Sequence, residues 1–240
     1  SAALMLLRDR RSAHGAALFS AKEMPTFYKA LPFSLTAAQQ RALDEILSDL
    51  GSGRQMSRLL LGDVGSGKTV VAAASAWCAA VNGYQTALLA PTEILARQHY
   101  ERLAPLFERL GVRCGLLVGS LSPQKKTALR AALADGTLGL VIGTHALLTE
   151  STGFSRLGLV IADEQHRFGV AQRAALLAKG DRPHLLVLSA TPIPRTLALL
   201  LYGDLEVSVI DALPPGRKPV QTFLVDESYR KRLNAFVRRQ

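Results

Sequence analysis

One stretch of the sequence places glycine, lysine and threonine directly after a short apolar run. Residues 62–69 read GDVGSGKT, which fits the phosphate-binding pattern G-x-x-x-x-G-K-[ST]. The glycines let backbone N–H groups point at phosphate oxygens, Lys68 would reach the β and γ phosphates, and the Thr69 hydroxyl would ligate Mg²⁺. We therefore expect a bound nucleotide. The loop that would hold it consists of Gly62, Asp63, Val64, Gly65, Ser66, Gly67, Lys68 and Thr69, with the Asp63 side chain turned away from the phosphates.

Two adjacent carboxylates follow another apolar run, in LGLVIADEQH at 157–166. In a parallel sheet, the end of that strand faces the same crevice as the phosphate loop. Asp163 would hold Mg²⁺, usually through water, and Glu164 would act as general base on the attacking water. An isolated Asp-Glu pair is more often solvated surface, but its place after a buried strand favours a functional role. One carboxylate for the metal and one for water indicate hydrolysis.

The elements that must position these groups can be read from the apolar pattern. Runs bounded by turn residues predict strands at 59–61, 86–90, 114–118, 138–142, 157–162, 185–189 and 207–210. Helical patterns lie at 37–50, 70–81, 94–110, 124–134, 170–177 and 196–201. Strands that are apolar throughout and alternate with helices predict a mostly parallel, doubly wound α/β sheet with helices on both faces.

Charge and composition give the outline of the chain. Of the net charge of +10 over 240 residues, +3 falls in residues 1–30, +5 in 217–240 and only +2 between them. The two cysteines form no CxxC pair, so neither a disulfide framework nor a zinc site is expected. The apolar stretch at 70–81 would span only about 18 Å as a helix, too short to cross a bilayer. We expect a flanking helical segment at 1–30, one nucleotide-binding domain at 31–212, and a linker at 213–240 that enters a second domain.

Further motifs resemble those of superfamily 2 helicases. DEQH at 163–166 resembles motif II, and SAT at 189–191 resembles motif III. The adenine-recognition motif is similar to residues 31–43, motif Ia to residues 90–99 and motif Ib to residues 143–148. DEQHRFG and TPIPRT are the most specific pieces of a similarity to the RecG family, which remodels branched DNA. The similarity covers about residues 31–220. It implies a RecA-like P-loop NTPase fold.

The same resemblance assigns roles to individual residues. Gln39 would read the adenine edge with its amide, and Phe33 would pack nearby. Gln165 and His166 would sense the γ-phosphate, and Ser189 and Thr191 would couple hydrolysis to movement. The residues expected to contact the DNA backbone are Thr92, Gly143 and Thr144, and those expected to link the ATP cleft to DNA or to a neighbouring lobe are Arg167, Phe168, Gln172 and Arg195.

The resemblance also implies partners. A motor of this superfamily clamps ATP and Mg²⁺ between two RecA-like lobes. The second lobe supplies an arginine finger, which raises the turnover rate about 10³- to 10⁵-fold in related nucleotide hydrolases. We expect this chain to be the first lobe, acting with a second lobe and a wedge domain on branched DNA, as a monomer in the bacterial cytoplasm. By itself it should hydrolyse ATP slowly.

Three alternatives remain at this level. A transcription-repair coupling translocase shares GDVG, RFGV and TPIPRT but typically has Phe where this loop has Ser66, and DEEHRFG or DEEQRFG in motif II. A small-molecule P-loop kinase shares only the phosphate loop. A non-catalytic nucleotide-dependent binding module would not need both Lys68 and Glu164.

Overall fold

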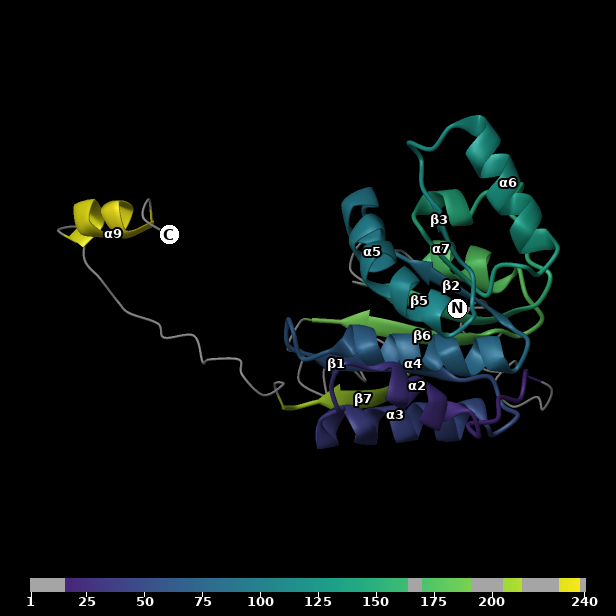
Figure 1. Cartoon of the computed structure of the whole chain (residues 1–240), viewed down its shortest axis with the longest axis horizontal. Coiled ribbons are helices and arrows are strands. Elements are labelled where there is room, and N and C mark those ends of the chain that lie inside the picture. The colour runs from purple at the N-terminus through teal and green to yellow at the C-terminus, as the bar shows by residue number, and fades with distance from the viewer. Residues whose placement is uncertain (1–15, 164–169, 191–204, 213–228, 238–240) are drawn as a thin grey trace.

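Most of the described residues fold around one central sheet (Figure 1). The computed structural model describes residues 16–163, 170–190, 205–212 and 229–237. Among these residues, seven strands pair in parallel in the order β3-β4-β2-β5-β6-β1-β7. The strands are β1 Ser57–Gly62, β2 Gln85–Leu89, β3 Cys114–Leu117, β4 Leu140–Gly143, β5 Leu157–Asp163, β6 His184–Ser189 and β7 Glu206–Ile210. The predicted parallel α/β sheet is confirmed.

Helices connect most of these strands, close to where the sequence predicts them. The helices are α2 Met24–Ala30, α3 Ala37–Leu50, α4 Lys68–Val81, α5 Glu93–Arg109, α6 Pro123–Ala134, the short 3₁₀ helix η1 His145–Leu147, α7 Val170–Leu177 and α9 Arg230–Val237. The helix predicted at 196–201 lies outside the described residues, as do residues 213–228 of the predicted linker, whereas α9 lies within it. No helix in the described ranges is long and apolar enough to cross a membrane.

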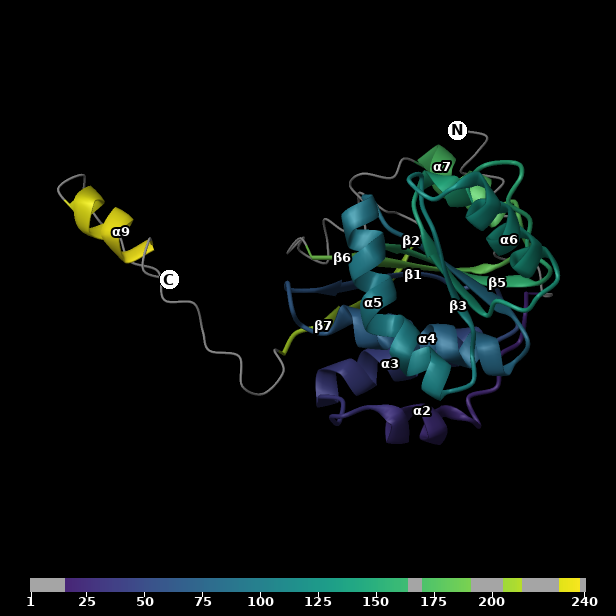
Figure 2. The same ribbon diagram turned by 45° about the horizontal axis from the view of Figure 1, so that its top comes forward.

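Two layers of helices cover the sheet (Figure 2). In β1, the side chain of Leu60 joins a core with α3, α4 and α5, while its neighbours Leu59 and Leu61 join a second core with residues of α6 and α7. This alternation follows from the period-2 geometry of a strand, and it needs both faces to be covered by helices. The predicted helices on both faces are confirmed.

The segment before α2 packs on the same core as α2 itself. Phe19 of this segment and Phe27 of α2 are almost fully and fully buried in the larger core cluster. His184 of β6 holds this segment, because its Nδ1 accepts from the Met56 N–H at 3.0 Å and its Nε2 lies 2.7 Å from the Ala17 carbonyl oxygen. With Nδ1 accepting, Nε2 is the donor to Ala17. Burial lowers the pKa of His184 from its usual value of 6.5.

Candidate nucleotide-binding site

The glycine-rich loop joins the end of β1 to the first turn of α4. Gly65 and Gly67 have φ angles of +79° and +91°, in the left-handed region that favours glycine. Gly67 is the N-cap of α4, so the loop delivers the chain directly into the N-terminus of a helix. The Lys68 ammonium group donates to the carbonyl oxygens of Gly62 at 2.6 Å and Asp63 at 2.9 Å. The lysine is therefore held at the mouth of the loop, where a phosphate-binding cation is needed.

Gln39 ties the loop to α3. Its Oε1 accepts from the Thr36 N–H at 2.9 Å and completes a capping box at the start of α3, while its Nε2 donates to the Ser66 carbonyl at 2.8 Å. The side chain is 3% exposed, and a methyl group on Gly67 would overlap its amide. Each amide atom keeps one further hydrogen-bonding position. The adenine contact expected of Gln39 therefore stays a prediction. Gln39 would make this contact while it keeps both internal hydrogen bonds.

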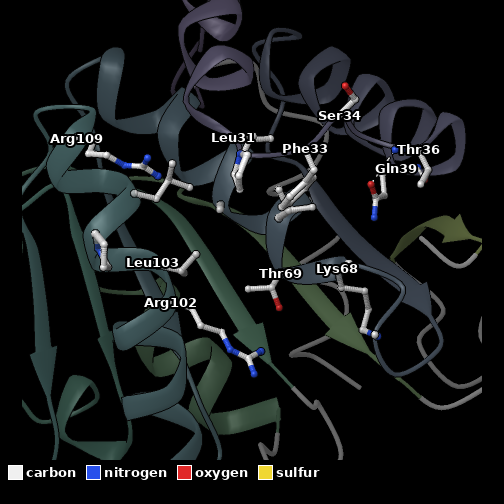
Figure 3. A pocket seen from close by; sticks show the side chains of 17 residues that line it. Leu31, Phe33, Ser34, Thr36, Gln39, Lys68, Thr69, Arg102, Leu103 and Arg109 are labelled. Atoms are coloured by element: carbon white, nitrogen blue, oxygen red, sulfur yellow. Dashed lines mark hydrogen bonds between the residues drawn. The ribbon is translucent and has the colours of Figure 1, made fainter. Parts of the chain in front are cut away.

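A pocket of about 950 Å³ lies between this loop, the segment before α3, and α5. Its volume is at the upper end of the range of about 300–1,000 Å³ typical of ligand sites. Phe33, 53% exposed, stands in it, and Figure 3 shows Lys68 and Thr69 on one side and Arg102 extending from α5 toward the same space. The described residues that line the pocket include Lys68, Arg102 and Arg109 and no acidic side chain. This charge matches a triphosphate.

The strand register brings Asp163 to the same edge of the sheet. Asp163 ends β5 opposite Leu188 of β6, and Leu188 is opposite Leu60 of β1, two residues before the loop begins. Two strand spacings amount to about 10 Å. The carboxylate therefore lies near the phosphate loop, as a site that holds Mg²⁺ between a phosphate and a carboxylate requires.

His99 of α5 was not recognised from the sequence as a site residue. Its Nε2 lies 2.6 Å from Asp163 Oδ2, and the two side chains are only 10% and 15% exposed. The pair joins residues 64 positions apart, and a histidine on a helix carries no signal for so distant a partner. Arg102 and Arg109 were also missed. Their seven-residue spacing, which places them on one face of a helix, could have suggested a shared role.

The residues expected to contact DNA lie at the carboxyl edge of the sheet. Thr92 is the N-cap of α5 and its hydroxyl accepts from the Leu95 N–H at 3.3 Å. Gly143 ends β4 in a buried position where a side chain would overlap the Leu117 carbonyl, so close packing alone explains this glycine. Thr144 precedes η1. Contact of these three residues with DNA stays a prediction.

Two further predicted residues are described. Ser189 ends β6 opposite Leu61 of β1 and is 2% exposed, and Gln172 lies half-buried on α7. The remaining predicted site residues lie outside the described residues: Glu164, Gln165, His166, Arg167, Phe168, Thr191 and Arg195.

Together, the parallel sheet, the glycine-rich loop between β1 and α4, and the carboxylate at the end of β5 define a RecA-like P-loop nucleotide-binding domain. A comparison with known families narrows this class. The chain belongs to the DEAD/DEAH box helicase family, whose sequence profile matches residues 36–200. This membership excludes the small-molecule kinase alternative.

Within that family, the chain is similar to RecG proteins, both in sequence and in a solved structure. The ATP-dependent DNA helicases RecG of Synechocystis sp. and Acidithiobacillus ferridurans are 54% and 58% identical, over 89% and 86% of this chain. The chain spans 26% and 30% of their lengths. A structure of RecG bound to a three-way DNA junction matches with a TM-score of 0.86 and 46% identity, over 98% of this chain and 32% of that one. The predicted RecG-like superfamily 2 motor lobe is confirmed, and these relatives favour it over the coupling translocase.

Proposed function

We propose that this chain is the first motor lobe of a RecG-like DNA helicase that uses ATP hydrolysis to remodel branched DNA. The proposal is supported by the RecG relatives and by the similarity to a RecG that was solved bound to a three-way DNA junction. The lobe would extend over residues 31–212 with 1–30 as its flank, and 213–240 would lead to the second lobe. Acting on bacterial DNA, it would work as a monomer in the cytoplasm with its second lobe and a wedge domain.

The described residues fit ATP and Mg²⁺. The positive φ angles at Gly65 and Gly67, the pocket without acidic lining, and the Asp163 carboxylate supply what a Mg²⁺-bound triphosphate needs. No cluster of three His, Cys, Asp or Glu side chains occurs in the described ranges. Proteins usually hold Mg²⁺ through one or two carboxylates together with substrate phosphates, and Asp163 supplies one such carboxylate.

Each part of the reaction falls to a stated residue. Lys68 would bind the β and γ phosphates, Thr69 and Asp163 would hold Mg²⁺, and Glu164 would orient and deprotonate the attacking water. When bound, Mg²⁺ neutralises charge that develops on the phosphates. The residues proposed for base recognition, γ-phosphate sensing, DNA contact and coupling are Phe33, Gln39, Gln165, His166, Thr92, Gly143, Thr144, Ser189, Thr191, Arg167, Gln172 and Arg195.

The observation that carries this proposal is the register that brings the phosphate loop and Asp163 to one edge, two strands apart. Calorimetric titration of the chain with ATP and Mg²⁺ tests it. Lys68→Ala should weaken binding at least tenfold, about 1.4 kcal/mol. Lys125→Ala removes an exposed lysine from α6, on the opposite face of the sheet, and should not change binding. Equal affinities in both variants would contradict the proposal.

Binding to single-stranded DNA tests the partner. Contacts to phosphates predict that log affinity falls with log salt concentration by about 0.7 for each phosphate contacted. Absence of binding, or an affinity for single-stranded DNA that does not change with salt concentration, would contradict contacts to DNA phosphates.

A further inference from the structure

His99 and Asp163 form a buried pair beside the proposed metal site. His99 lies seven residues, or about two helical turns, after Thr92 at the start of α5. Its Nε2 lies 2.6 Å from Asp163 Oδ2, a distance typical of a short hydrogen bond to a carboxylate. The bond therefore connects α5 to the last residue of β5.

The environment of the imidazole indicates which nitrogen carries the hydrogen. His99 Nδ1 is buried and has no hydrogen-bond partner among the described residues. A hydrogen on that nitrogen would be a buried donor without an acceptor, which costs about 1–3 kcal/mol. We therefore assign the hydrogen to Nε2, which donates to Asp163 Oδ2.

We propose that His99 is a positioning residue that fixes the orientation of the Asp163 carboxylate for the hydrated Mg²⁺. The inference rests on the proposed function, in which Asp163 helps to hold that ion. The terminal torsion of an aspartate is broad and roughly two-fold, so an unrestrained carboxylate samples several orientations. The bond to His99 occupies Oδ2, and no partner of Oδ1 is found in the described part of the chain. That leaves Oδ1 for the water shell of the ion.

Two substitutions separate this role from packing. In His99→Gln, the amide nitrogen takes the position of Nε2 and can still donate to Asp163. In His99→Asn, the amide ends near the position of Nδ1 and is too short to reach. Both side chains are polar amides, so they differ mainly in the presence of the hydrogen bond.

The readout is metal-dependent nucleotide binding by the chain, without turnover. A non-hydrolysable ATP analogue is titrated with saturating Mn²⁺ and again with EDTA, and the ratio of the two affinities gives the contribution of the metal. We expect His99→Asn to lower this ratio about tenfold, the lower end of the 10- to 100-fold effect of outer-shell partners on metal affinity. His99→Gln should stay within about twofold of the wild type, in keeping with a retained donor. Affinity in EDTA should be unchanged in both, which also shows that the loop is folded.

The outcomes are distinguishable. If the wild type binds no analogue, or if Asp163→Asn leaves the ratio unchanged, the proposed function itself fails. If Asp163→Asn lowers the ratio but His99→Asn does not, or if Gln and Asn at position 99 behave alike, the positioning role is wrong. Should His99→Asn not fold, ¹⁵N NMR of the wild-type imidazole decides: a hydrogen on Nε2 supports the role, and a hydrogen on Nδ1 overturns it.

Discussion

Gln39→Glu separates the two hydrogen bonds that the Gln39 amide makes. A glutamate keeps the acceptor for the Thr36 N–H, and Glu is a usual partner in a capping box, so α3 should keep its cap. The same change removes the donor to the Ser66 carbonyl, 2.8 Å away, and brings a negative charge to the phosphate loop. The perturbation therefore acts on the loop and spares the helix.

The magnitude follows from these contacts. Loss of a donor to a buried carbonyl costs about 1–3 kcal/mol, and each kcal/mol lowers the melting temperature of a domain of this size by about 2–4 °C. We expect a lower melting temperature and at least tenfold weaker ATP binding, about 1.4 kcal/mol. Circular dichroism melting and calorimetric titration with ATP and Mg²⁺ measure both quantities.

Gln98→Glu is the matched control. Gln98 is exposed on α5, so this variant adds the same charge away from the loop. If Gln39→Glu melts and binds ATP as Gln98→Glu does, then the Gln39 amide does not support the loop and our account of it is wrong.

Three other changes test separate features. Gly67→Ala should abolish ATP binding, because the position has a φ of +91° and an added methyl group would overlap Gln39. Gly111 has a φ of +75° but open space around it, so Gly111→Ala should lower the stability of the chain and leave ATP binding intact. Arg102→Ala should weaken ATP binding less than about fivefold, since the side chain is exposed, and the effect should shrink at high salt. Burial lowers the pKa of His184, so as the pH falls the unfolded chain binds a proton at this histidine before the folded chain does. The free energy of unfolding should therefore decrease as the pH drops below about 6.5. Chemical denaturation at a series of pH values should show a smaller decrease for His184→Gln than for the wild type.

The sequence predicted the elements of the fold because each strand is a separate local signal. Apolar runs bounded by turn residues located all seven described strands, with ends shifted by up to two residues, as in β4, which begins at Leu140 where 138 was predicted. The order of the strands was not predicted. It depends on which strand each crossover helix reaches, and local periodicity carries no information on that.

In the site, too, the local features were predicted from the sequence and the contacts between distant residues were not. The phosphate loop is a contiguous motif whose chemistry depends on its own backbone, and it was predicted residue by residue. The bond between His99 and Asp163 and the bond between Gln39 and the Ser66 carbonyl join residues 64 and 27 positions apart. Such contacts depend on how α5 and α3 pack against the sheet, so only the folded chain reveals them.

The central claim is that the phosphate loop and the carboxylate end of β5 share one bound Mg²⁺. A crystal structure of the chain with Mg²⁺ and a non-hydrolysable ATP analogue tests it most directly. We predict that Thr69 Oγ1 lies about 2.1 Å from the ion, that Asp163 reaches it through water, and that Lys68 contacts the terminal phosphates. Phosphates bound away from Lys68, or an ion that neither Thr69 nor Asp163 reaches directly or through one water, would contradict the account.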